Sequence, residues 1–176
     1  DNGSKCKYGP GYDTHRYTVR QDSINDRLKA SVKNYNAATC YAVTRSSVWC
    51  KSWGNLQKYS SGWVLELEHA FTTYIWGKLG SVDDYYWMRS SENPPAITAD
   101  VSKLPLQEWW GSAKFKYERL NFITKIGEEM IHADQMDRAN AEALAVEVFE
   151  SYLKENQKKR SRIYLFHLKC RRLVVN

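Results

Sequence analysis

The sequence lacks the long apolar run that a membrane-spanning helix needs, because no uninterrupted apolar stretch reaches about 18 residues. It also lacks a glycine-rich phosphate loop, a Gly-x-Ser-x-Gly elbow and a His-Glu-x-x-His motif. No internal repeat or low-complexity segment is visible. These absences argue against a transmembrane protein and leave nucleotide binding, serine hydrolysis and zinc-peptidase chemistry without their usual motifs.

Close Cys-x-x-Cys pairs, which zinc and redox sites use, are missing as well. The 4 cysteines are instead widely spaced, an even set typical of two disulfides in an oxidising compartment. The chain begins at Asp1 rather than Met, so we expect either a mature, processed form or a trimmed piece of a longer chain. We therefore expect a secreted, periplasmic or otherwise oxidising location.

The spacing of the cysteines bears on how they pair. On one straight helix the α-carbons of Cys40 and Cys50 would lie about 15 Å apart, whereas a disulfide tolerates at most about 7 Å. The Ser-Ser pair at 46–47 favours a turn between them, so we expect Cys40–Cys50 together with Cys6–Cys170. The second bridge would be worth about 4 to 5 kcal/mol in the loop-entropy model. The other two connectivities stay open.

The stretch CYAVTRSSVWC, residues 40–50, resembles the Cys-x9-Cys unit of small helical proteins of the mitochondrial intermembrane space. That resemblance implies two such units in an antiparallel hairpin. Here one unit covers 11 of 176 residues, and Cys6 and Cys170 lie far from any second copy. No function is inferred from it.

Charge is concentrated at one end of the chain. Residues 154–172 hold eight Lys and Arg against the single acid Glu155, so this segment carries +7 while the whole chain carries +6. Such a basic end suits an anionic partner, namely a lipid surface, a nucleic acid or an acidic protein face. The alternative is a solvated helix end whose cations meet the negative end of the helix dipole. The candidate contact residues are Lys158, Lys159, Arg160 and Arg162.

Hydrophobic periodicity indicates helices with little strand signal. We expect an extended arm at 1–20, helices at about 23–42 and 61–79, a short helix from Ser81 and another at 105–110. Residues 112–157 follow as one long helix or as two broken near 137–140, and the end at 163–170 is helix or strand. The fold class is therefore all-α: an irregular, disulfide-stapled bundle of about four to five helices. It forms one domain, 1–176, with a basic tail at 158–176.

Two Glu-x-x-His motifs, Glu66 with His69 and Glu129 with His132, are the main candidates for chemistry. Residues three apart share a helix face, so each pair can converge on one ion. The motifs resemble those of ferritin-like di-iron carboxylate proteins. That resemblance implies His69 and His132 as nitrogen ligands and Glu66 and Glu129 as bridging carboxylates.

The chain departs from this family in its other ligands, because no glutamate precedes Glu66. A mononuclear site made of the four motif residues, most plausibly for zinc, stays an alternative. In the purely structural interpretation, Glu66 and His69 pair with each other or with Thr73, and residues 128–137 form a solvated acidic face.

The leading hypothesis is a non-enzymatic helical binding protein without a cofactor. It would act by protein–protein contact as an inhibitor, an immunity-type factor or a subunit of a larger assembly. The richness in Trp and Tyr, 7 and 12 residues, fits a binding role because such side chains bury much area at small entropic cost. One alternative is a metal-binding protein or di-metal enzyme with iron, manganese or zinc. The second alternative is a binder of anionic surfaces or nucleic acid through the basic tail.

Overall fold

The structure is a computed structural model that describes residues 18–33, 35, 39, 42–54, 56–81 and 104–174, with only the helical backbone beyond Lys158. Its helices are α1 (Ile24–Lys33), α2 (Ser46–Gly54), α3 (Gly62–Trp76), α4 (Leu106–Gly111), the 3₁₀ helix η2 (Ala113–Phe115), α5 (Lys116–Asp134) and α6 (Arg138–Val174). These ranges contain no β-strand, only an isolated bridge between Val19 and Leu79. The all-α prediction is confirmed, with six α-helices rather than four to five in the described residues.

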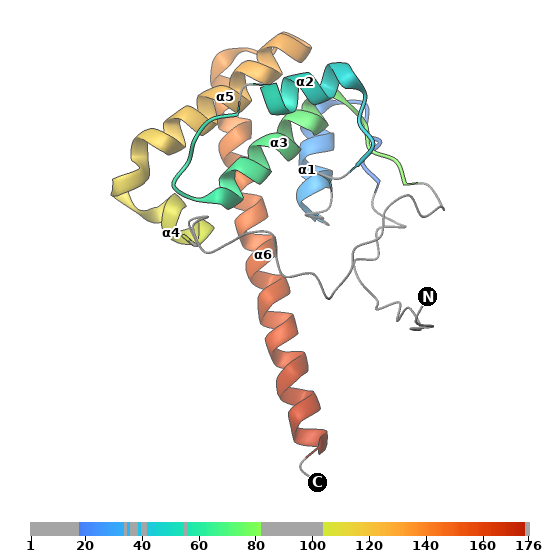
Figure 1. Ribbon diagram of the computed structural model, residues 1–176, viewed down its shortest axis with the longest axis vertical. Helices are drawn as coiled ribbons and strands as arrows, with labels where there is room; N and C mark the ends of the chain where they lie inside the picture. The colour runs from blue at the N-terminus through green and yellow to red at the C-terminus, as the bar shows by residue number, and fades with distance from the viewer. Residues whose placement is uncertain are drawn as a thin grey trace, which may run out of the picture.

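Helix α3 lies at the centre of the packed head, against α1, α2 and α5, and α6 runs behind it along α1 and α5 (Figure 1). The sequence of α3 is apolar on nearly every side, and a helix of that kind must be covered on nearly every side. Its buried residues are Val64, Leu67, Glu68, His69, Ala70, Phe71, Thr72, Thr73, Tyr74 and Ile75. Trp63, in the first turn of α3, is 53% exposed.

A second part of the core is an aromatic cluster built from α4, α5 and α6. The Phe122 and Phe149 rings pack edge to face at 5.2 Å, and Trp110 stacks on Phe149 at 4.4 Å. Trp109 is fully buried beside both phenylalanines. Edge-to-face and offset contacts of this kind are the favourable arrangements of aromatic rings. Leu120, also on α5, lies outside this cluster and is 48% exposed.

Helix α1 begins where the sequence predicts. The Ser23 hydroxyl accepts the Asp26 backbone N–H at 3.0 Å and donates to the Asp26 carboxylate at 2.7 Å, so Ser23 caps the first turn of the helix. The helix is fastened to α3 by Arg27, whose buried guanidinium donates to the backbone carbonyls of Tyr74 and Ile75 at 2.8 and 2.9 Å. It ends at Lys33, well before residue 42, where the expected helix ended.

The segment from 46 to 54 bears on two predictions. Ser46 and Ser47 do not make a turn but begin α2, since the Val48 and Trp49 N–H groups both bond to the Arg45 carbonyl. Serine suits the first turn of a helix as well as it suits a reverse turn. Cys50 therefore lies on α2 as an exposed, free thiol, and the predicted Cys40–Cys50 bridge is not supported. Cys6, Cys40 and the Cys170 side chain lie outside the described residues, so the other predicted bridge, Cys6–Cys170, is neither supported nor contradicted.

The break predicted near 137–140 separates α5 from α6. Gln135 closes α5 in the left-handed conformation, with φ of 52°, and its N–H bonds to the Ile131 carbonyl. Asp137 then accepts the Asn140 N–H at 3.0 Å and starts α6. Gly127 lies within α5, which continues through it to Asp134. It marks a close approach to α6, because a Cβ there would lie 3.2 Å from the Cγ of Glu142.

Helix α6 is far longer than its packed part. It has 37 residues, about 55 Å, and runs away from the other helices toward the C-terminus (Figure 1). The last buried residue among its described side chains is Leu153. The ambiguous end at 163–170 is thus helical. Among the described residues no helix has the length and apolar character to cross a membrane. The arm at 1–17 and the short helix expected from Ser81 lie mostly outside the described residues.

Candidate functional site

The first Glu-x-x-His motif lies in the middle of α3, but its two side chains have different partners. The Tyr35 hydroxyl donates to the Glu66 carboxylate at 2.8 Å. Burial raises the pKa of Glu66, and the hydrogen bond from Tyr35 only partly opposes this. The predicted pairing of Glu66 with His69 is not observed.

His69 lies on the side of α3 that α2 covers, where it is 1% exposed. Its ring lies 4.2 Å from the Trp53 ring at an interplanar angle of 32°, and 6.2 Å from the Trp49 ring. Burial lowers the pKa of His69, while a hydrogen bond to the Ser52 backbone acts in the opposite direction. Its Nδ1 has no hydrogen-bond partner among the described residues. Thr73 donates to the His69 backbone carbonyl and does not bond to its ring.

The second motif, on α5, is divided between the interior and the surface. Glu129 is buried and accepts the Trp76 indole N–H at 2.6 Å, while Lys125 pairs with its other oxygen at 3.2 Å. His132, near the end of the same helix, is exposed. The expected solvated acidic face at 128–137 is therefore wrong for Glu129, which faces α3.

The four motif residues thus do not converge on one point. Glu66 bonds to Tyr35, His69 packs under α2, Glu129 is held by Trp76 and Lys125, and His132 lies on the surface. Within the described ranges no group of three or more His, Cys, Asp or Glu side chains could hold a metal ion. The metal centre predicted from the paired motifs is not assembled by these residues.

Glu68, which the sequence analysis did not single out, is the most buried acid of α3 at 1% exposure. It accepts the Tyr59 hydroxyl in a short hydrogen bond and a backbone hydrogen bond at Gln57. Burial raises the pKa of Glu68, and the nearby charge of Glu129 raises it further, whereas Tyr59 and the charge of Lys125 lower it. The only sequence signal for the burial of Glu68 is its position on α3 beside buried apolar residues such as Leu67 and Phe71. The Glu-x-x-His pattern points to Glu66 instead.

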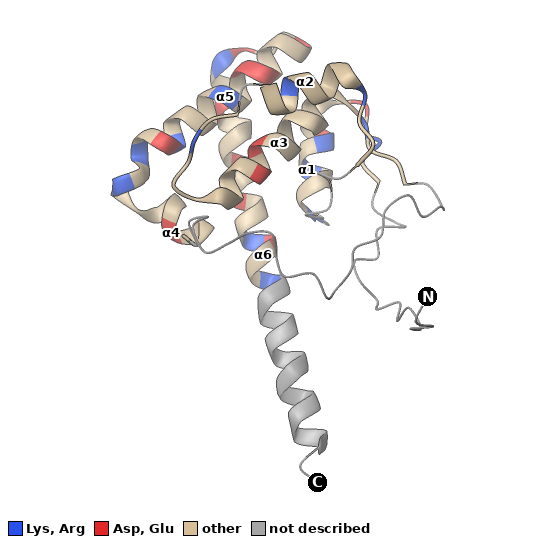
Figure 2. Ribbon diagram, in the orientation of Figure 1, with Lys and Arg blue, Asp and Glu red and all other residues tan. Residues whose placement is uncertain are grey.

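Glu68, Glu129, Lys125, Tyr59 and Trp76 therefore form one polar network between α3 and α5, the α3–α5 network. Figure 2 shows the acidic residues of α3 within the head, surrounded by helices. Each carboxylate of the network has a donor from the protein itself. Buried carboxylates that are hydrogen-bonded in this way hold neighbouring helices in register.

Helix α2 contacts the α3–α5 network at Trp76. The ammonium of Lys51 lies 3.6 Å from the centre of the Trp76 ring, a close cation–π contact. Trp76 therefore contacts α2 with its ring and α5 with its N–H. The α2 contact and the α3–α5 network meet at this one tryptophan.

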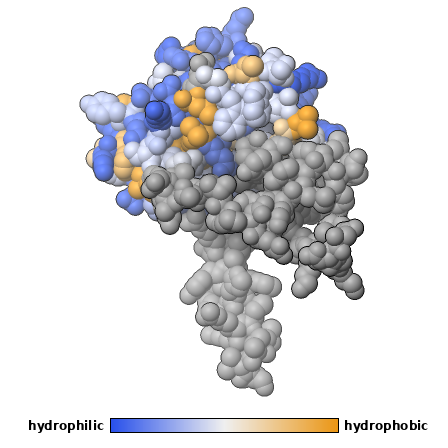
Figure 3. Space-filling view, viewed as in Figure 1, coloured by the Kyte–Doolittle hydropathy of each residue, from blue (hydrophilic) through white to orange (hydrophobic). Residues whose placement is uncertain are grey.

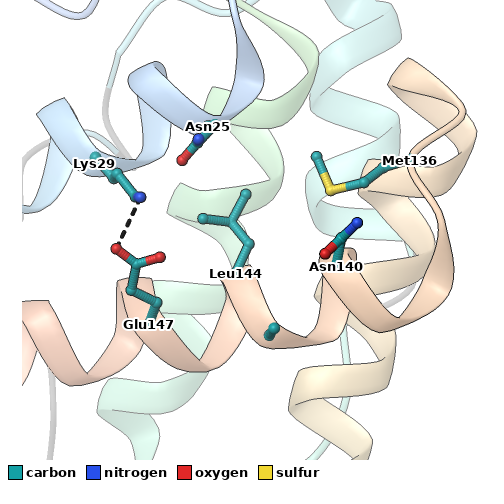
Figure 4. Close-up of a pocket in the computed structure, with 7 residues that line it drawn as sticks. Asn25, Lys29, Met136, Asn140, Leu144 and Glu147 are labelled. Carbon is teal, nitrogen blue, oxygen red and sulfur yellow. Dashed lines mark ion pairs between the residues drawn. The ribbon is translucent and has the colours of Figure 1, made fainter.

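A shallow pocket of about 290 Å³ lies on another side of the head, between α1, α6 and the residues that join α5 to α6 (Figure 4). Lys29 and Glu147 close one side of it as an ion pair of 2.8 Å. Asn25, Asn140, Met136 and Leu144 form the remainder together with Ala143. Because the only charges of this pocket neutralise each other at an exposed position, the pocket offers no strong site for a charged ligand.

The surface in the view of Figure 3 mixes hydrophilic residues with small, separate hydrophobic patches. The large exposed apolar side chains of the described residues are Val43, Trp49, Trp63, Tyr117 and Leu120. Of the predicted contact residues, Lys158 is exposed and pairs with Glu155 at 2.7 Å. Lys159, Arg160 and Arg162 lie on the helical backbone of α6, and their side chains are outside the described residues.

Comparisons of this chain with protein-family models, curated proteins and solved structures find no match. The function is therefore inferred from the geometry of the chain itself.

Proposed function

We propose that this chain is a non-enzymatic helical binding protein that holds an acidic protein partner through the distal, basic part of α6. It would serve as an inhibitor, an immunity-type factor or a subunit of a larger assembly. The observation that supports the proposal is that α6 continues to Val174 although its described buried residues end at Leu153.

The helix beyond Leu153 is about 30 Å long at 1.5 Å per residue. Helices of this length in water gain most of their stability from packing one face against something else. Basic residues already gather on the last described turns of α6 (Figure 2), and the sequence from 154 to 172 carries +7. A partner of opposite charge would cover such a helix and would be attracted to it over about a Debye length, which is about 8 Å at physiological salt.

The α3–α5 network supports the same proposal from the other side. Its buried acids accept hydrogen bonds from protein donors, and these bonds offset the cost of burying them. We therefore assign these acids a structural role and not a catalytic one. The head is then a rigid base that fixes the direction of α6. The Lys158–Glu155 pair leaves this assignment unchanged, because an exposed pair contributes little.

Reversal of Lys158, Lys159, Arg160 and Arg162 to Glu tests the contact. A pull-down from the native source with the wild-type chain first identifies the partner, and its affinity is then measured over a range of salt. We expect the fourfold reversal to weaken binding more than tenfold at low salt and to remove most of its salt dependence.

The matched control reverses Arg20, Arg45, Lys58 and Lys116, which are exposed on the head and change the net charge by the same amount. This control should bind as the wild type does. Equal weakening by both variants would make the effect one of net charge, and unchanged binding by the tail variant would contradict the proposal. Capture of nucleic acid or anionic vesicles in place of a protein would also contradict it, in favour of an anionic-surface binder.

The oxidising location also stays a proposal, and the free Cys50 removes part of its support. Alkylation of the native protein without reductant, followed by mass spectrometry, tests it directly. A Cys6–Cys170 bridge predicts that these two residues are protected while Cys50 is labelled. Labelling of all cysteines would contradict the location.

A further inference from the structure

Helix α2 is only lightly attached to the head. Of its nine residues only Ser52 is buried, and its main packing partner is α3. Trp49 is 44% exposed and Cys50 is exposed as well. A helix this short gains almost nothing from its own hydrogen bonds, so its position depends on a few side-chain contacts with α3.

Those contacts meet at His69. The centre of its ring lies 4.2 Å from that of the Trp53 ring and 6.2 Å from that of the Trp49 ring. In a separate contact between the same two helices, the Lys51 ammonium lies 3.6 Å from the centre of the Trp76 ring. Two nitrogen atoms in the His69–Trp53 contact, Nδ1 of His69 and Nε1 of Trp53, are buried without a hydrogen-bond partner among the described residues. An unpaired buried polar atom is destabilising, and both would regain hydrogen bonds to water if α2 moved away. What holds the contact closed is ring packing and the hydrogen bond between His69 and the Ser52 backbone.

No described charge is placed to stabilise a positive His69. On α3, Glu66 is bonded to Tyr35 and Glu68 to Tyr59. On α5, Glu129 is bonded to Trp76 and Lys125.

The remaining groups around α3 would not help either. On α2, Lys51 is itself positive and Cys50 is an exposed thiol. On α1, Arg27 is positive and bonded to the end of α3. Burial accordingly lowers the pKa of His69, and no ion pair opposes it.

We propose that α2 is an acid-released clasp: protonation of His69 breaks its contact with Trp53, and α2 then leaves α3 and uncovers Trp53 and Trp76. A charged imidazolium would carry an N–H at Nδ1 with no acceptor in a dry contact. The tryptophan faces return part of this cost as a cation–π attraction. Taking a charge out of water costs several kcal/mol even after the protein relaxes, which is more than this attraction returns.

The direction of the effect follows from proton linkage. With α2 open, His69 takes a proton near its ordinary pKa of 6.5, whereas with α2 closed it takes one only at lower pH. The closed state is therefore fully favoured above pH 6.5 and loses stability as the pH falls below it. Between pH 7.5 and 5.5 the opening constant of α2 should rise by up to about tenfold.

Hydrogen exchange of the whole chain at pH 7.5 and 5.5, corrected for the intrinsic pH dependence of exchange, measures this opening. We expect the amides of Cys50 to Gly54 to open about tenfold more at pH 5.5, with α5 and the packed part of α6 unchanged. His69→Phe keeps the ring contact and His69→Gln keeps a hydrogen-bonding side chain, and both should make the opening of α2 independent of pH. His132→Gln, a matched change at an exposed histidine, should leave the tenfold rise intact.

Equal opening of wild-type α2 at both pH values would overturn the proposal, as would a tenfold rise that persists in both His69 variants. If the variants do not fold, histidine ring resonances of the wild type decide the question. Titration of His69 at the same midpoint as α2 exchange supports the clasp, and opening of α2 without titration of His69 refutes it.

Discussion

Replacement of Glu129 tests whether the α3–α5 network stabilises the head. The side chains of Glu129 and Lys125 are only 12% and 17% exposed, and Trp76 donates to the same carboxylate at 2.6 Å. Breaking a buried ion pair from one side costs about 3 to 5 kcal/mol. The Lys125 ammonium can partly rehydrate, so Glu129→Leu should lower the free energy of unfolding by about 3 kcal/mol. Glu129→Gln keeps an acceptor for Trp76 and should cost about 1 kcal/mol.

Urea unfolding followed by circular dichroism measures both changes, with the slope m unchanged if only stability is altered. The control is Glu147→Leu. It removes an ion pair with Lys29 that is as short, 2.8 Å, but is 55% and 41% exposed at the two side chains. An exposed pair is worth about 0 to 1 kcal/mol. Equal losses for Glu129→Leu and Glu147→Leu, or a loss below about 1 kcal/mol for Glu129→Leu, would refute the reasoning from burial.

Three further predictions concern the same head. Arg27→Met should cost about 3 kcal/mol in urea unfolding, because two buried carbonyls at the end of α3 lose a charged donor, and Arg138→Met is the exposed control. Gly127→Val should cost about 2 kcal/mol by forcing α5 from α6. Gly127→Ala should be nearly neutral, because its Cβ would crowd only the Glu142 Cγ, at 3.2 Å, and would otherwise make ordinary contacts with the α6 backbone. Glu68→Gln should gain stability over wild type at pH 7, and the gain should vanish as the pH falls below about 4.5. Burial raises the pKa of Glu68 in the folded state, so its charged form costs stability only at higher pH; a difference that stays constant with pH would contradict this.

The spacing of Glu66 and His69 correctly indicates a shared helix, but not a shared ligand. On α3 these two residues have different neighbours: Glu66 accepts a hydrogen bond from Tyr35, whereas His69 packs against Trp53 of α2. Sequence spacing fixes direction around one helix axis, whereas convergence on an ion depends on which helices pack on each side. That information is not contained in a four-residue motif.

The turn predicted at Ser46–Ser47 is wrong for a related reason. A Ser-Ser pair is compatible with a reverse turn and with the first turn of a helix, and the local sequence does not choose between them. In the structure the Arg45 carbonyl accepts the first hydrogen bonds of α2, and α2 packs on α3 through Trp53 and His69. Cys50 lies on the exposed side of α2.

The sequence by itself determined the helical class and the start of the first helix near Ser23, and it gave a break near 137–140 as one of two alternatives. Each of these depends on contacts within a few residues or on a period of 3.6. Only the tertiary structure decided that Glu68 and Glu129 belong to one network, that His69 lies under α2, and that α6 leaves the head after Leu153. These features depend on which helix lies beside which, and that is set by the packing of the whole core.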